Sequence, residues 1–575
     1  MAGLMDLPNE IIYLILSYII VCPIAAAAPS FSFLVPTRRP DEPNICIFQL
    51  RQVNHRFNSH ISRLFFENIT IPYEAYSSFP TFLKSAIFSP ENENVGYIKR
   101  LSIKPFILDS ESRCRYLNSL GSLVKDLDVA REEFKADMKK DIAGLIGRLR
   151  PNQLVGFECA IHGLVDYQAL IDTQRSLQQL LVNPVELVPH ILDNPNFFLP
   201  CLQNLHLEGF RPSHETQYQL LARTIIQPYA SKLRVLSIDM TEDTRDGSPS
   251  TYHSEAILET CKSRLKATLG ADILDPQVIP LEFTQLEELS IQGSHNSHPI
   301  PVFEGLLPIT SLGRLTIKNC TQLNDVYRLL PTAFPRINHL HIEGSLTMRR
   351  VTRILEHFPR LSHFHLSHIP KSSADSSFFN RLALWHHRCS LQSIWLGAGH
   401  ISSQKVITRN TRPRRLHVND IGRHLRRFVE IAVEVRLDEL FLGNNIPNWP
   451  RLPNLELLRV LGSDTEPESE SDTPPEPPMH PSDAIKILWT QRLEQTFCKI
   501  TNFPGEFWLI HGMYKKPVYS GPTGPRVEIF KSWIGEGGEV VIKEMSFRDA
   551  RRRFPRSLIL GTERDQAMWE GPVRG

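Results

Sequence analysis

A short apolar pattern recurs along most of the chain and constrains its fold more than any other feature. An apolar residue is followed by two residues, a second apolar residue, one residue and a third apolar residue. The first positions of the pattern are Ile98, Val124, Leu154, Leu177, Leu202, Leu233, Leu286, Leu312, Ile337, Leu361, Leu391, Leu437 and Leu455. From Leu286 to Leu391, successive first positions are separated by 26, 25, 24 and 30 residues.

The pattern has a direct physical consequence. Its apolar residues point to one side of a short strand. One turn cannot bury such a ridge alone, so successive turns stack into a continuous core. A period of about 20 to 29 residues is typical of a leucine-rich repeat solenoid. We therefore predict an α/β solenoid over residues 73–462, with parallel strands on the concave face and helices on the convex face. An ordinary α/β domain with parallel strands is the alternative.

The segments between the patterns predict helices. Val351 to His357 has helical spacing, as has Asn324 to Leu330. Two long intervals predict further helices, near Ala256 to Leu269 and from Asp420 to Val435. The residue that usually closes the strand is present in only two turns, as Cys320 and Asn445, so the repeats are degenerate.

Two amphipathic helices precede the repeats. Asp6 can cap the first, over LMDLPNEIIYLILSYII, and the second lies in IFQLRQVNHRFNSHISRLFFENITI. The first places Ile11, Leu14, Ile15, Tyr18 and Ile19 on one face, and the second Leu50, Val53, Phe57, Ile61 and Leu64. Two short helices of this kind usually complete their burial against another surface.

These residues resemble an F-box. The resemblance lies in Leu7-Pro8-x-Glu10-Ile11, Ile15-x-x-Tyr18-Ile19, Leu50-Arg51-x-Val53-Asn54-x-x-Phe57 and Leu64-Phe65-Phe66, within residues 1–72. The chain departs from the family in an inserted loop over residues 22–44. It implies docking onto a Skp-family adaptor and, through it, a cullin. The implied adaptor-binding residues are Leu7, Pro8, Glu10, Ile11, Ile15, Leu50 and Val53. An unrelated helical cap on the solenoid is the alternative.

Residues between the apolar positions face the concave side of the predicted strands. They are Glu288, Ser290, Gln292, Arg314, Thr316, Lys318, His339, His341, Glu343, His363, His365, Ser367, Ser393 and Trp395. Neighbouring strands lie about 4.8 Å apart, which would place His339 beside His363 and His341 beside His365. We predict target binding by Arg314, His339, His341, His363, His365 and Trp395, the last as an exposed aromatic anchor. A solvated face without a ligand is the alternative, and the histidines raise the further hypothesis of a pH-sensitive groove.

Composition gives little support for other partners. Lys and Arg number 64 against 62 Asp and Glu, so net charge favours neither nucleic acid nor a membrane surface. The nine cysteines contain no CxxC pair, which indicates reduced thiols in a cytoplasmic or nuclear protein. A secreted protein is the alternative, because Ile11 to Val21 and Ala25 to Ala28 resemble a signal peptide. No Lys or Arg precedes that segment.

The C-terminal part departs from the repeat. Residues 463–482, rich in proline and acidic residues, predict a disordered linker. Residues 483–575 predict an α+β region that could cap the array, with a helix over Ala484 to Phe497. Strands are predicted over Trp508 to Ile510, Arg526 to Phe530 and Glu539 to Ile542, and Gly535 to Gly538 predicts a hairpin turn.

No catalytic motif is recognisable. His386-His387-Arg388-Cys389 is the nearest candidate for nucleophilic chemistry, and its position predicts a structural role. We predict a protein with no catalytic residues, no metal and no cofactor. The F-box resemblance and the repeats together imply a substrate-recognition subunit of a Skp–cullin–F-box ubiquitin ligase, with an unknown protein substrate. A ubiquitin-independent leucine-rich repeat scaffold is the alternative.

Overall fold

A computed structural model describes part of the chain. The described residues are 62–63, 66–72, 88–91, 93–104, 127–161, 163–193, 198–208, 225–240, 282–293, 309–318, 320, 334–343, 348–358, 360–367, 386–397, 429–434, 456–461, 506–511, 528–535, 540–545, 547–554, 557 and 560. The chain divides into two compact units: unit 1, residues 1–312 with Gly575, and unit 2, residues 313–574.

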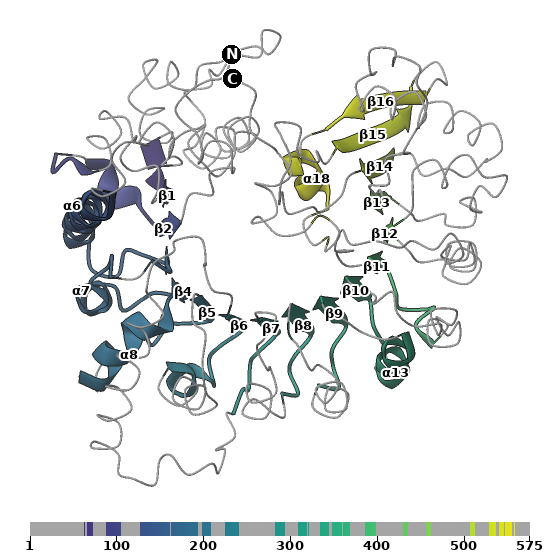
Figure 1. The fold of residues 1–575 in the computed structure, drawn as a ribbon, viewed down its shortest axis with the longest axis horizontal. Coiled ribbons are helices and arrows are strands. Elements are labelled where there is room, and N and C mark those ends of the chain that lie inside the picture. The colour runs from purple at the N-terminus through teal and green to yellow at the C-terminus, as the bar shows by residue number, and fades with distance from the viewer. Residues whose placement is uncertain are drawn as a thin grey trace, which may run out of the picture. The chain divides into compact units, whose positions relative to one another are not determined.

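Unit 1 contains a parallel sheet in which each described strand lies beside the one before it in the chain (Figure 1). Its strands are β1 (Asn68–Pro72), β2 (Arg100–Lys104), β3 (Gly156–Cys159), β4 (Gln179–Val182), β5 (Asn204–Glu208), β6 (Val235–Asp239) and β7 (Glu288–Gln292). All six adjacent pairs are parallel. Parallel neighbours need a connection that returns the chain to the same end of the sheet.

Helical segments supply part of these connections. They are η2 (Glu93–Tyr97), α6 (Leu127–Arg148), α7 (Tyr167–Thr173), α8 (Pro184–Asp193) and η4 (Gln227–Tyr229). In Figure 1, α6, α7 and α8 lie on the same side of the neighbouring strands. Tyr167 and Leu170 of α7 are fully buried, so this side of the sheet holds the core of unit 1.

The strand sequences explain why the sheet has one apolar side. In β5, Leu205 and Leu207 are buried, whereas Asn204, His206 and Glu208 are half-buried. Successive side chains of a strand point to opposite faces, so the leucines form the inner row. The register places Leu205 between Leu180 and Leu236, which continues the row across three strands.

Two buried glutamines join neighbouring turns of unit 1. Nε2 of Gln153 donates to the carbonyls of Val95 and Ile98, at 2.7 and 2.9 Å. Gln174 accepts from the Leu154 backbone N–H at 2.9 Å and donates to the Arg150 carbonyl at 3.0 Å. Buried backbone groups between strands need such partners, because an unsatisfied group costs about 1–3 kcal/mol.

Unit 2 repeats this arrangement and then changes it. Its parallel strands are β8 (Arg314–Lys318), β9 (His339–Glu343), β10 (His363–Ser367), β11 (Ser393–Gly397), β12 (Glu430–Glu434), β13 (Leu457–Leu461) and β14 (Glu506–His511). Strands β15 (Glu528–Ile534) and β16 (Val540–Glu544) continue the sheet antiparallel. The described helices of this unit are α13 (Met348–His357) and α18 (Phe547–Arg553).

The predicted α/β fold with parallel strands is therefore confirmed. The helix expected over Val351 to His357 is part of α13, and the strands expected near Trp508, Phe530 and Ile542 are β14, β15 and β16. β15 and β16 pair antiparallel, with Ile534 opposite Val540, as the predicted hairpin requires, and the turn residues 536–539 lie outside the described residues.

Two local predictions were wrong. The repeat strand expected at Val124-Leu127-Val129 is contradicted from Leu127 onward by α6, whose long run of Ala, Glu, Lys and Asp offers no alternating apolar face. The helix expected from Asp420 to Val435 is contradicted over Glu430–Glu434 by β12. β-branched Ile431 and Val433 alternate there, and β11 and β13 supply backbone hydrogen bonds on both sides.

The parallel arrays also extend beyond the predicted boundaries of the repeats. β1 lies in the segment assigned to the F-box and pairs with β2, and β14 lies in the segment assigned to the C-terminal region and pairs with β13. The inserted loop, the acidic linker, and the helices expected at 256–269, 324–330 and 484–497 lie outside the described residues. No described helix is both long enough and apolar enough to cross a membrane.

Candidate interaction surface

The histidines of β9 and β10 stack as pairs on the strand face of unit 2 opposite the apolar row. The register aligns His339 with His363 and His341 with His365, as predicted. Each pair of rings is separated by 3.9 Å between centroids, with interplanar angles of 11° and 9°. We call these four residues the histidine ladder. Arg314 of β8 is in register with His339, so a cation begins the outer row.

The pair of His339 and His363 is held by hydrogen bonds to residues that precede the strands. The Ser362 hydroxyl donates to the Asn338 carbonyl at 3.0 Å, so its oxygen accepts from Nδ1–H of His363 at 2.9 Å. Nδ1 of His339 bonds to the side-chain oxygen of Asn338. Both rings therefore carry their proton on Nδ1.

Two members of the ladder resist protonation. Burial, together with the positive charge of Arg314, lowers the pKa of His363 to about 4. Burial also holds the pKa of His341 well below its ordinary value, with Lys318 adding to the effect. Desolvation and a nearby cation both disfavour an imidazolium. His341 and His363 are therefore neutral near pH 7.

Trp395 continues the row formed by His341 and His365, but it is not an exposed anchor. Its ring stacks on His365 with centroids 3.5 Å apart, so the predicted neighbourhood is confirmed. Trp395 is only 8% exposed and His365 only 2%. The prediction of an exposed aromatic residue was wrong, because a segment from the C-terminal end of the chain covers this part of the face.

We call this segment, residues 547–560, the covering segment; its described residues are 547–554, 557 and 560. Its apolar side chains Ala550, Phe554 and Leu560 form one buried cluster with strand residues. The strand residues of that cluster are Trp395, Leu457, Trp508, Ile510 and Ile529. The strands place these on the same face as the ladder, because His363 aligns with Ser393 and the register continues to Trp508.

A buried carboxylate joins the covering segment to the sheet. One oxygen of Glu430 accepts hydrogen bonds from the hydroxyls of Ser557, at 2.8 Å, and Ser393, at 3.1 Å. Burial raises the pKa of Glu430, while the two hydroxyls and the nearby Arg551 oppose that increase. Ser557 belongs to the covering segment and Ser393 to β11, so this one group connects both.

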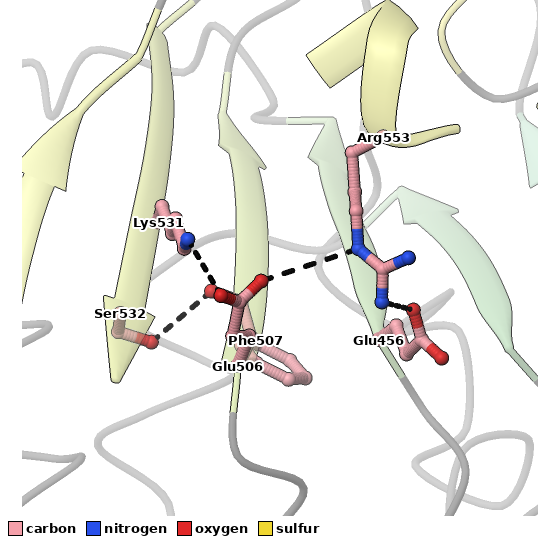
Figure 2. A network of polar contacts seen from close by, with 6 residues as sticks. All are labelled: Glu456, Glu506, Phe507, Lys531, Ser532 and Arg553. Atoms are coloured by element: carbon pink, nitrogen blue, oxygen red, sulfur yellow. Dashed lines mark hydrogen bonds and ion pairs between the residues drawn. The ribbon is translucent and has the colours of Figure 1, made fainter. Parts of the chain in front are cut away.

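A second polar contact lies at the edge of the covered face (Figure 2). Arg553 of α18 pairs with Glu456 at 2.6 Å and lies 4.0 Å from Glu506. Lys531 of β15 bonds to the other oxygen of Glu506 at 2.7 Å. Figure 2 shows the two cations on opposite sides of Glu506. Arg553 is 48% exposed, so the pair orients α18 more than it stabilises it.

The corresponding strand face of unit 1 has a different chemistry. Its outward residues include the carboxylates Glu158, Glu208, Asp239 and Glu288, interspersed with hydroxyl and amide side chains. Glu158 accepts from the Ser102 hydroxyl at 2.9 Å and from Gln179 at 3.0 Å. This face carries four carboxylates and the cation Arg100, whereas the β8–β10 face of unit 2 carries Arg314, Lys318, Glu343 and the ladder.

The remaining candidates have structural surroundings. His387 is fully buried, accepts from the Leu361 N–H at 3.2 Å and donates to the Leu355 carbonyl at 2.7 Å. His387 therefore joins two turns of unit 2, which confirms the predicted structural role. The sequence alone did not identify its two hydrogen-bond partners. Among the described residues, no group of three His, Cys, Asp or Glu side chains is arranged to hold a metal ion. The seven predicted adaptor-binding residues lie outside the described residues.

Comparison with known proteins leaves the family open. The sequence matches no protein-family model and no curated protein.

Proposed function

We propose that this protein is the substrate-recognition subunit of a Skp–cullin–F-box ubiquitin ligase, built on a leucine-rich repeat solenoid. The observation that carries the proposal is the row of parallel strands in each unit, in chain order and in register. Under this proposal the chain itself performs no bond chemistry. It binds an adaptor at one end and a protein target on the strand face.

The solenoid is supported by how the core is built. Leu315 of β8, Leu340 of β9 and Phe364 of β10 lie in register and are at most 1% exposed. Each strand has too few apolar residues to form a core alone, so its stability depends on its neighbours. Single compact α/β domains commonly reorder their strands, whereas here each described strand follows its predecessor within each unit.

The adaptor end is supported by the F-box resemblance. Under this proposal Leu7, Pro8, Ile11, Ile15 and Leu50 contact the adaptor. A chain that joins adaptor and target in this way works in the cytoplasm or the nucleus, where ubiquitin ligases act on folded proteins.

Co-purification with a Skp-family adaptor tests the proposal. We expect the intact chain to retain the adaptor and the Leu7→Ala, Pro8→Ala double variant to lose it at least about tenfold, which corresponds to about 1.4 kcal/mol. A matched control is Leu34→Ala with Pro36→Ala, the same residue types in the inserted loop. Absence of adaptor from the intact chain, or equal loss in both double variants, contradicts the proposal.

A ubiquitin-independent scaffold is the second candidate, favoured by one observation. β1 pairs directly with β2, so the segment after the F-box-like helices is already part of the sheet. Those helices could then act only as a cap. Deleting residues 1–60, which spares β1, separates the two. If the helices act only as a cap, the deletion lowers the thermal midpoint and removes no partner. If they form an F-box, the deletion removes the adaptor.

A further inference from the structure

The covering segment lies on the surface that the proposed function assigns to a protein target. It packs on outward residues of β11, β13, β14 and β15, and in Figure 1 its helix α18 lies on the opposite side of the strands from α13. Outward side chains take no part in the repeat core, because alternate residues of a strand point to opposite faces. The covering segment therefore occupies part of the strand face in the way that a bound ligand would.

The contact between the covering segment and the sheet has the composition of a binding interface. Its buried part includes Trp395 and Trp508, and Phe554 packs edge-to-face on Trp508. At its edge Arg553 pairs with Glu456 at 2.6 Å, and both side chains are partly exposed. Buried tryptophan beside partly exposed arginine is typical of protein–protein interfaces. The repeat core of β8–β10, in contrast, consists of leucine, isoleucine and phenylalanine.

Two polar groups oppose closure of the covering segment. Nε1–H of Trp508 is buried and has no hydrogen-bond acceptor within the part of the chain that the structure describes. The carboxylate of Glu430 is 7% exposed, and its burial disfavours the ionised form despite the two hydroxyls that it binds. A buried donor without an acceptor and a buried charge both weaken the contact that encloses them. Detachment lets water reach both groups, so the covered state is less stable than its apolar contacts alone would make it.

The attachment of the covering segment allows it to leave while the sheet stays intact. The N–H of Met545 donates to the Ile529 carbonyl at 2.8 Å and so fixes the end of β16, and one residue separates Met545 from α18. The backbone hydrogen bonds described for the covering segment are internal, from Phe554 to Ala550 and from Ser557 to Phe554. Only side chains therefore need to separate from the strands when the segment leaves.

We propose that the covering segment is an intramolecular ligand of this face, and that a protein target displaces it with a segment of the same chemistry. The inference rests on the proposed function in taking the strand face as the target site. The target segment is an arginine-rich helical turn followed by phenylalanine and leucine. Phenylalanine and leucine take the places of Phe554 and Leu560 in the apolar cluster, and an arginine takes the place of Arg553 at Glu456.

Displacement by a peptide tests the inference on the intact chain. The probe is a peptide with the sequence of residues 547–560, isotope-labelled so that its fragments differ in mass from those of the chain. The control peptide carries alanine in place of Phe554 and Leu560. We expect an excess of the probe to accelerate hydrogen exchange of the α18 amides in the chain at least about fivefold, because the bound peptide holds the covering segment off the face. The amides of α13, and the chain with the control peptide, should show no change.

Release of the covering segment should raise the affinity for the probe. Phe554→Ala with Leu560→Ala removes two of its apolar contacts. By fluorescence anisotropy we expect this released chain to bind a dye-labelled probe at least about tenfold more tightly than the intact chain, since a tethered competitor has an effective concentration of the order of mM. Ile534→Ala removes an exposed apolar side chain outside the cluster and should leave the affinity unchanged.

A second substitution locates the probe on the face. In the released chain Glu456→Gln is expected to weaken binding about threefold, and Glu356→Gln, an exposed glutamate on α13, to leave it unchanged. Exchange of α18 that excess probe does not accelerate overturns the inference. Equal affinity of the released and intact chains also overturns it. If the released chain does not unfold cooperatively, the exchange measurement on the intact chain decides alone.

The same preparations distinguish this inference from the proposed function. The released chain is expected to retain the Skp-family adaptor, and Leu7→Ala with Pro8→Ala to leave displacement by the probe unchanged. An adaptor interaction without displacement by the probe overturns the intramolecular ligand alone. Displacement in a chain that never binds the adaptor supports the intramolecular ligand and contradicts the ligase proposal.

Discussion

Two parts of one strand face in unit 2 differ in exposure: one is open and the other is covered. On β8–β10 the described outward residues are Arg314, Thr316, Lys318, Glu343 and the histidine ladder. Three of the four histidines keep part of their surface exposed. On β11–β15 the outward residues include Trp395, Leu457, Trp508, Ile510 and Ile529, and the covering segment buries them. Parallel pairing in register runs through both parts as far as β14, and β15 then pairs antiparallel. Side-chain chemistry therefore decides which part of a repeat sheet remains open.

The largest expected effect lies on the covered part. Trp508→Ala removes a side chain that is 3% exposed and packs edge-to-face on Phe554, with centroids 5.7 Å apart. We expect a loss of about 3–5 kcal/mol in the free energy of unfolding, measured by urea titration. Trp533→Ala, a half-buried tryptophan on the neighbouring strand, is the control and should cost less than half as much. Equal costs would show that the cover contributes little.

Acid should destabilise the open part of the face. The pKa of His363 is lowered to about 4, below the ordinary value of 6.5, so the folded state binds this proton less tightly than the unfolded state. Its contribution to stability is present above about pH 6.5 and is lost as the pH falls towards about 4. Thermal midpoints measured across that interval should fall less in His363→Gln than in the original chain. Identical slopes would contradict the lowered pKa.

A smaller pH dependence of stability, of opposite sign, is expected at Glu430, where the covering segment meets the sheet. Burial raises the pKa of Glu430 above its ordinary 4.5, so the folded state holds this proton more tightly than the unfolded state. The contribution is present below about pH 4.5 and is lost as the pH rises through the folded pKa. Glu430→Gln keeps the acceptor for Ser393 and Ser557 and should change stability at pH 7 by no more than about 1 kcal/mol. Calorimetry at several pH values should show a flatter profile for the variant; an unchanged profile contradicts this assignment.

The smallest effect is expected at the exposed edge shown in Figure 2. Arg553 is 48% exposed, so Arg553→Ala should cost at most about 1 kcal/mol, less at high salt. Urea titrations at low and high salt measure both quantities, with Arg552→Ala on the same helix as the control. A loss comparable to that of Trp508→Ala would mean that ion pairing, rather than apolar burial, holds the covering segment.

The sequence predicts the register of the open part because that register depends on local alternation. The pairs His339 with His363 and His341 with His365 follow from strand period and repeat spacing alone, and both are confirmed. Stacking of Trp395 beside His365 follows in the same way. Alternation assigns each residue to a face, and the alternating burial of β4, β5, β7, β8 and β9 bears this out.

Exposure could not be predicted in the same way. Whether Trp395 is open depends on Phe554 and Leu560, which lie far along the chain and carry no repeat pattern. The strand β12 was also missed, because its pairing with β11 and β13 outweighs the local preference read from residues 420–435. The sequence does contain one indication of the covering segment. Leu457, Trp508 and Ile510 are outward apolar residues on neighbouring strands, and a solvated face would not carry such a run.

Residue-resolved labelling of the intact chain tests the contrast between the open and covered parts most directly. Diethyl pyrocarbonate should modify His339 and His363, with fully buried His387 as the internal control that stays unmodified. Hydroxyl radicals should oxidise Trp395 and Trp508 slowly, since they are 8% and 3% exposed. Rapid oxidation of both tryptophans, or histidines of the ladder as unreactive as His387, would contradict an open polar face beside a covered apolar one.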